Sequence, residues 1–344
     1  MTDTDRPAKV ARVQAILDEQ SADAVLLVRP ESVSWILNGA RVTVPTGGPA
    51  VLAVEVTRAG DITVVVPDNE AERLVAEELE AGLHVVTIPW FGQLRQARAG
   101  VIAEAEVVAQ MRAARASLLP GERSRYRELG LDVASATTAV LSSAQPTGSE
   151  RSLAARLCAA IIERGAEPLV ILVAGASRIH LQHPLPSDAP IGDRAMVAVG
   201  ARRHGLVANL TRWATWNGAQ HNVEQLLEVE ADAYAATHVG RSLNEVLASI
   251  AAAYETRGYP HDSWLRHHQG GPTGYLGRDP KVTPETTDVV RAGQAFAWNP
   301  WVPGNKVEDT VVVDEHALEV LTADPHWPTV NVRGVARPIA LAID

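Results

Sequence analysis

Residues 197–213, VAVGARRHGLVANLTRW, contain two apolar runs on either side of a glycine-containing turn. The first run is typical of a β-strand, and the second ends in Asn209-Leu210-Thr211-Arg212. Longer apolar runs surround this stretch, so we predict strands over residues 168–175, 194–203 and 205–216. The fold class follows from the elements that precede and follow these strands.

Helical and strand patterns alternate along most of the chain. In "KVARVQAILDEQ", Val10, Val13, Ile16 and Leu17 share one helical face, and strands are predicted at "ADAVLLV", "GPAVLAVEVT", "DITVVVPD" and "LHVVTIPW". Further helices are predicted at "EAERLVAEELEAG", 120–144, 149–165, 222–239 and 242–258, with strands at the C-terminal end in "QAFAWNPW", "KVEDTVVVDE" and "ALEVLT". We therefore predict an α/β (α+β) protein with a small α/β domain over residues 1–117 and a second domain over residues 118–344.

Composition excludes several kinds of partner. The 344 residues carry a formal net charge of −10, which argues against nucleic acid because phosphate binding needs a cationic face. The one cysteine, Cys158, excludes an intramolecular disulfide and fits a reducing compartment. The N-terminus lacks the apolar core of a secretion signal, and "PLVILVAGA" is too short to span a bilayer. We expect a cytoplasmic protein that binds neither nucleic acid nor a membrane.

Five motifs carry a family resemblance by their order along the chain. They are "ADAVLLVRPESVSWILNGAR", "LVAGASRIHLQHPLP", "VAVGARRHGLVANLTR", "HHQGGPTGY" and "GQAFAWNP…KVEDTVVV". In this order they resemble the pita-bread (M24-type) family of creatinase, prolidase, aminopeptidase P and methionine aminopeptidase, over nearly the whole chain. The resemblance implies a creatinase-like N-terminal domain followed by a pita-bread domain, and it implies a homodimer.

The peptidases of this family bind two divalent metal ions through two Asp, one His and two Glu. The resemblance matches these ligands to Ala198, Asn209, Gly271, Asn299 and Glu308, so only the last carboxylate remains. Hard cations need several oxygen ligands and zinc needs several N, S or O ligands, so we expect no metal and no cofactor. Replacing the other carboxylates also removes the repulsion between them in a metal-free site. A different metal site built from His183, His268 and Glu308 stays open.

Creatinase works without metal, with a histidine as proton shuttle and glutamates that hold a guanidinium group. The resemblance matches that histidine to His183, and Glu308 lies in a comparable position. A neutral imidazole can take a proton from water near pH 7 and return it to a leaving nitrogen. We predict His183 and Glu308 as catalytic residues, with His268 as the next candidate base.

Residues near these motifs are candidates for substrate binding: Asn209, Asn299, Trp213, Trp298, Arg212, Lys306, His180 and His267. Amides beside aromatic faces suit sugars, heterocycles or cations, although each tryptophan on its own fits core packing equally well. Arg212 also fits a structural role, and Lys306 fits an ion pair that neutralises Glu308. His180 and His267 also fit positions on the surface or at a helix end.

Two classes of function remain at this point. The first is a metal-independent, creatinase-like hydrolase of a C–N bond in a small polar molecule. The alternative is a catalytically inactive peptidase homologue that binds a small ligand or serves as a structural protein. The pair His183 and Glu308 favours the enzyme, whereas Ala198 and Gly271 favour the alternative because their side chains have no chemistry. A working dinuclear metallopeptidase is not expected.

Overall fold

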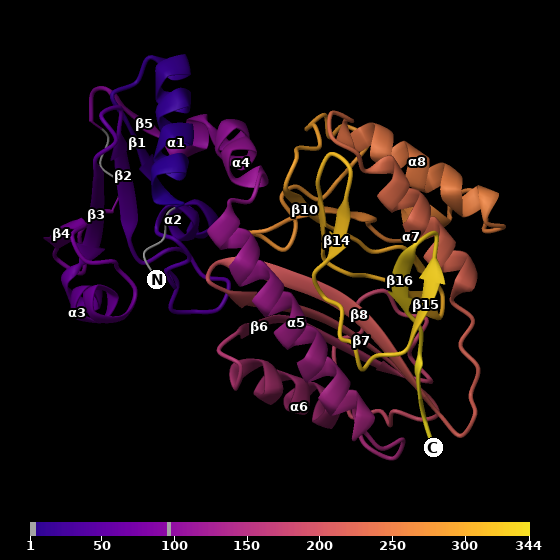
Figure 1. Cartoon of the computed structure of the whole chain (residues 1–344). Coiled ribbons are helices and arrows are strands. Elements are labelled where there is room, and N and C mark those ends of the chain that lie inside the picture. Colours follow the sequence, from indigo (N-terminus) through magenta and orange to yellow (C-terminus); the bar gives the residue numbers. More distant parts are fainter. Residues whose placement is uncertain (1–4, 95–97) are drawn as a thin grey trace. The chain divides into compact units, whose positions relative to one another are not determined.

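The computed structural model describes residues 5–94 and 98–344 (Figure 1). The chain divides into two units, of which the first comprises Met1–Arg125 with His204–Leu206 and the second comprises Tyr126–Arg203 with Val207–Asp344. The division falls inside helix α5 (Pro120–Ser142). Within the described residues, none of the helices has the length and apolarity that crossing a membrane requires.

The first unit is built on a mixed five-stranded sheet with the strand order β4-β3-β2-β1-β5. Its strands are β1 (Ala24–Leu27), β2 (Ala53–Thr57), β3 (Ile62–Pro67), β4 (His84–Ile88) and β5 (Val101–Ala103). Its helices are α1 (Arg6–Gln20), α2 (Pro30–Ile36), α3 (Asp68–Glu77) and α4 (Val108–Ala116). Val13, Ile16 and Leu17 of α1 are buried, as their helical spacing predicts.

One half of the second unit packs two helices on a four-stranded sheet. The sheet has the order β17-β8-β7-β6, with β6 (Glu167–Gly175), β7 (Arg194–Arg203), β8 (Leu206–Trp216) and β17 (Leu341–Ile343). Figure 1 shows α5 and α6 (Glu150–Ile162) lying along this sheet, and Leu141 and Leu157 share a core with Val173 and Val197. The two-residue turn between β7 and β8 places His204 and Gly205 at positive φ, as a tight hairpin requires.

The other half of the second unit repeats this layering with a second sheet. Its order is β14-β13-β10-β9, with β9 (Gly270–Thr273), β10 (Gln294–Trp298), β13 (Val311–Val313) and β14 (Leu318–Val320). Helices α7 (Glu224–Ala236) and α8 (Leu243–Thr256) bury Leu227 and Ile250 with Phe296 and Val311 of the sheet. The short pairs are β11 (Trp301–Val302) with β12 (Asn305–Lys306), and β15 (Thr329–Val332) with β16 (Val335–Pro338).

Most of the predicted elements are present, and one differs in a way that matters for the site. The strands predicted over 168–175, 194–203 and 205–216 are β6, β7 and β8, and the last two predicted helices are α7 and α8. The strand predicted from "KVEDTVVVDE" is interrupted, because β12 ends at Lys306 and β13 begins at Val311. In the interruption the carbonyl of Glu308 accepts a 3.0 Å hydrogen bond from the backbone N–H of Thr211 in β8. The segment between β12 and β13 is therefore attached to the first sheet of this unit.

Candidate functional site

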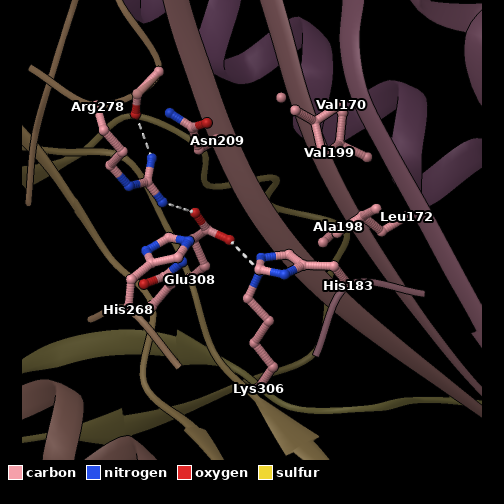
Figure 2. Close-up of a pocket in the computed structure, with 13 residues that line it drawn as sticks. Val170, Leu172, His183, Ala198, Val199, Asn209, His268, Arg278, Lys306 and Glu308 are labelled. Carbon is pink, nitrogen blue, oxygen red and sulfur yellow. Dashed lines mark hydrogen bonds and ion pairs between the residues drawn. The ribbon is translucent and has the colours of Figure 1, made fainter. Parts of the chain in front are cut away.

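A cavity of about 280 Å³ lies within the second unit. Strands β6, β7 and β8 form one wall. Strand β12 and the loops after β6, before β9, after β9, after β10 and after β12 supply the rest. Among the lining residues are His183, Ala198, Asn209, His268, Arg278, Asn299, Lys306 and Glu308, beside the apolar side chains of Val170, Leu172 and Val199 (Figure 2). Seven residues that the sequence singled out therefore meet at one cavity, although they are spread over more than 120 positions of the chain.

The charged centre of this cavity is the buried carboxylate of Glu308. Figure 2 shows Arg278 and Lys306 approaching it from different sides. Lys306 Nζ lies 2.9 Å from Glu308 Oε2, Arg278 Nη2 pairs with Oε1, and the Thr211 hydroxyl donates to Oε2 over 3.1 Å. Burial alone would raise the pKa of Glu308, but Lys306 and Arg278 outweigh it and lower this pKa to about 2. The predicted Lys306–Glu308 ion pair is confirmed.

Arg278 was not among the residues that the sequence suggested. It lies in the loop between β9 and β10. Its side chain is 14% exposed and reaches Glu308, thirty residues further along the chain. The sequence did contain a signal for Arg278. A single buried carboxylate needs cationic partners, and the segment "GYLGRDPK", which directly follows "GGPT", contains Arg278 and Lys281.

Three imidazoles stack at one side of the cavity. His183 Nε2 and His267 Nε2 are 3.3 Å apart, and the ring of His268 lies 4.4 Å from that of His267 between centroids. Burial lowers the pKa of His267 to about 2 and that of His268 to about 3, and the nearby cations Lys306 and Arg278 act in the same direction. The pKa of His183 is lowered by burial, Lys306 and Lys281. These three rings are therefore neutral near pH 7.

The same three histidines are the group of metal-ligating side chains that the described residues bring together. Their ligand nitrogens all lie within 4.8 Å of one another. The positive charges that lower the imidazole pKa values also oppose a divalent cation at this place. Glu308 cannot compensate such an ion, because both of its oxygens already face cationic partners.

Several predicted site residues lie away from the cavity. Trp298 is fully buried, donates its indole N–H to Thr237 over 2.9 Å and packs in the α7–α8 core, so it has no access to a ligand. Trp213 is buried and donates to the Lys306 carbonyl over 2.8 Å. Arg212 is buried against Asp309 at 2.8 Å, which is the structural role. His180 is exposed in the loop after β6 and is not a lining residue.

Gly271 also lies outside the cavity lining. Its φ is +140°, a region that residues with a side chain rarely adopt. A Cβ atom there would lie 2.6 Å from Val282 Cγ2 and 2.8 Å from the Pro280 carbonyl oxygen. A side chain at this position would therefore point into the packed segment 280–282.

A model of metallopeptidase family M24 matches residues 124–315, which is more than half of the chain. The chain belongs to metallopeptidase family M24. Solved structures similar to this M24 chain share its fold at low sequence identity. The prolidase of Pyrococcus furiosus is 21% identical with a TM-score of 0.72, and the match covers 91% of this chain and 100% of that chain. The Xaa-Pro dipeptidase of Bacillus anthracis is 16% identical with a TM-score of 0.73, covering 98% and 100%.

The likeness extends to proteins with other names. The N-terminal domain of FACT complex subunit SPT16 from Cicer arietinum is 13% identical with a TM-score of 0.66, covering 92% of this chain and 95% of that chain. A search of curated protein sequences found no match. The expected fold, an N-terminal α/β domain followed by a pita-bread domain, is confirmed, while the boundary at residue 117 stays a prediction. Because the fold is shared so widely, the activity of this M24 chain has to be argued from its site.

The side chains present do not fit the two metal ions that the family name implies. Of the five positions that the resemblance matches to metal ligands, Ala198 and Gly271 offer no side-chain donor, and Asn209 and Asn299 offer neutral amides. Asn209 already donates its amide N–H to the Thr273 hydroxyl over 3.1 Å. Glu308 is engaged by Arg278 and Lys306. In this M24 chain the positive charge beside Glu308 comes from two side chains.

Proposed function

We propose that this chain is a metal-independent hydrolase of a C–N bond in a small polar molecule, as creatinase is within the same family. The observation that carries the proposal is a neutral imidazole, His183, on a cavity whose carboxylate is neutralised by the chain's own cations. The family match supports a hydrolase, and the donor set described above supports independence from metal.

His183 is the proposed general base. Its Nε2 faces His267 Nε2, so His183 has a free lone pair at Nδ1 when it donates its Nε2–H to His267. Nδ1 then takes a proton from a water molecule, whose oxygen attacks the carbon of the C–N bond. As this bond breaks, the proton passes from Nδ1 to the leaving nitrogen, so the imidazole ends the cycle neutral. His268 lines the same cavity and is the next candidate base.

Glu308 has a different proposed role from the one that the creatinase resemblance implies. A glutamate that holds a substrate guanidinium needs free carboxylate oxygens. Here Oε1 faces Arg278, and Oε2 faces Lys306 and the Thr211 hydroxyl. We propose that Glu308 fixes the positions of the two cations, and that Asn209 and Asn299 bind the polar part of the substrate.

The first test concerns metal. Protein purified without chelator should contain no stoichiometric Mn, Co, Zn or Fe by elemental analysis, and added Mn²⁺ should not produce cleavage of Xaa-Pro dipeptides. Two equivalents of any of these metals, retained through dialysis, would contradict metal independence. One retained equivalent that is lost in His267→Ala would place a metal on the histidine cluster and overturn the proposal as well.

The second test concerns the base. A metabolite panel screened by thermal shift identifies a ligand, because a ligand of the native state raises Tm by mass action. For a substrate found in this way, His183→Ala should lower kcat by about 10²- to 10⁴-fold. His238→Ala, a change of an exposed histidine in the same unit, is the matched control. A ligand that is bound but never hydrolysed would instead support the inactive homologue.

We also propose a cytoplasmic homodimer whose partner is a small ligand rather than nucleic acid or a membrane. The single cysteine fits a reducing compartment, and the net charge of −10 opposes phosphate binding. Light scattering at micromolar concentration should give the mass of a dimer. A monomer mass would contradict this part of the proposal.

A further inference from the structure

The cavity carries more positive than negative charge. Arg278 and Lys306 are two cations, and Glu308 is the one carboxylate among the lining residues that the structure describes. The side chains of Lys306 and Glu308 are only 4% and 5% exposed. Two cations therefore share one carboxylate in a place where water screens charge poorly, and this excess of positive charge is costly unless an anion joins it.

Hydrogen-bond donors remain available around this surplus charge. Arg278 Nε is buried and has no hydrogen-bond partner. Lys306 Nζ makes one ion pair, with Glu308, although an ammonium group can donate three hydrogen bonds. An oxyanion that reaches both cations would satisfy donors that Glu308 alone leaves unused.

The rest of the lining limits the size and polarity of the ligand. Val170, Leu172, Ala198 and Val199 form an apolar wall next to the charged centre. The cavity volume of about 280 Å³ lies at the small end of ligand sites. A short aliphatic or small polar group fits this wall when its charged end faces Arg278 and Lys306.

We propose that Arg278 and Lys306 form a binding site for the carboxylate of a small anionic ligand, at the place where the family positions its metal ions. This inference names a substrate class for the hydrolase proposed above and rests on that proposal only for the claim that the ligand is hydrolysed. It reverses the polarity implied by the creatinase resemblance, in which carboxylates hold a cationic group. The substrate is therefore a small carboxylate-bearing molecule with a C–N bond.

The test compares three ligands of one shape and different charge: isobutyrate, isobutyramide and isobutyramidinium. Each is titrated at pH 7 into the full chain, and binding is followed by the ring C–H resonances of the histidines, two of which line the cavity. Isobutyrate should bind about 10- to 100-fold more tightly than the amide, as expected for hydrogen bonds to charged groups. The amidinium should bind most weakly. Tightest binding of the amidinium, or equal binding of all three, would overturn the inference.

Variants separate this site from a general electrostatic effect. Lys306→Met should weaken isobutyrate binding by about tenfold or more. Lys281→Met removes an exposed lysine near the same histidines and is the matched control, with an expected change of less than about threefold. If Lys306→Met does not fold, Arg278→Gln takes its place. Equal losses in the site variant and in Lys281→Met would contradict a defined site.

The outcomes also distinguish this inference from the proposed function. Hydrolysis of a substrate without a carboxylate, together with no preference for isobutyrate, overturns the carboxylate site and leaves the hydrolase. Binding of isobutyrate through Lys306 in a protein that hydrolyses nothing leaves the carboxylate site and overturns the hydrolase.

Discussion

Two buried charge networks begin at neighbouring residues and end differently. Glu308 lines the cavity and accepts a hydrogen bond from Thr211, whereas the next residues, Arg212 and Asp309, belong to the other network. There Asp309 pairs with Arg212 and Arg337, each at 2.8 Å, and Arg337 pairs with Glu230 at 2.7 Å. That network contains two formal positive and two formal negative charges, so it is balanced. The cavity network, with Arg278 and Lys306 against Glu308, has one positive charge more.

The difference teaches how to read a buried ion pair. A balanced network that is closed to solvent stabilises the fold, because each charge is paired with an opposite charge of the chain. A network on a cavity that has more positive than negative charge can bind a ligand that supplies the missing negative charge. Four changes, ordered from the largest expected effect to the smallest, separate the two networks from each other and from the packing around Gly271.

Removing one member of the balanced network should be the most damaging change. Arg337→Leu leaves Glu230 and Asp309 buried with too little positive charge, so the free energy of unfolding should fall by about 3–5 kcal/mol in urea. Arg333→Leu, which removes an arginine that pairs with Asp232 and Glu228 at the surface, should cost less than about 1 kcal/mol. Equal losses in the two variants would remove the basis for calling the first network structural.

The pH dependence of unfolding should differ in sign between the networks. The pKa of Glu308 falls from 4.5 to about 2 on folding, so its stabilisation is present above pH 4.5 and is lost as the pH falls toward 2. A shift of this size corresponds to about 3 kcal/mol. The pKa of Glu230 is raised, first by burial, so its contribution weakens as the pH rises. The stability difference between the unaltered chain and Glu308→Gln, measured in urea, should grow as the pH rises from 2 to 4.5. The difference for Glu230→Gln should shrink as the pH rises above 4.5, and parallel trends would contradict the assignment.

A substitution at Gly271, which packs against residues 280–282 and does not line the cavity, should lower the stability of the fold. It should leave the preference of the cavity for anionic ligands unchanged. Gly271→Ala places a methyl group 2.6 Å from Val282 Cγ2 at a strained φ, so we expect a loss of about 1–3 kcal/mol. Gly274→Ala is the matched control, because its φ of +151° is as unusual but nothing lies within 4 Å of the added carbon. Thermal unfolding that gives the same Tm for both variants would show that this contact does not matter.

Removing the surplus cation should have the smallest effect on stability. Lys306→Met leaves Glu308 paired with Arg278, so the cavity becomes formally neutral and no charge is left without a partner. We expect a change of less than about 1 kcal/mol in the free energy of unfolding, measured in urea at pH 7. A loss as large as that in Arg337→Leu would mean that the cavity network is structural too.

Much of the fold and part of the site can be predicted from the sequence. Apolar periodicity locates β6 to β8 and helices α7 and α8, since packing on one face leaves a regular pattern. The ion pair of Lys306 with Glu308 is also predictable. Residues that are two positions apart in an extended segment have their side chains on the same face. His183, Asn209 and Asn299 do reach the cavity.

What could not be predicted depends on loops and on side-chain direction. Arg278 reaches Glu308 through the path of an irregular segment, which leaves no periodic signal. The direction of a side chain at position 271 depends on a φ of +140°, which the sequence does not reveal. The aromatic candidates failed for a related reason, since Trp298 is adjacent to Asn299 and therefore faces the core rather than the cavity.

The packing around Gly271 also has an evolutionary consequence. A histidine at this position would meet Val282 and the Pro280 carbonyl before it could reach the cavity. A dinuclear metal site on these residues would therefore require the segment 280–282 to move, new carboxylates to be acquired, and two cations to be removed from Glu308. No single substitution therefore builds a dinuclear metal site on these residues.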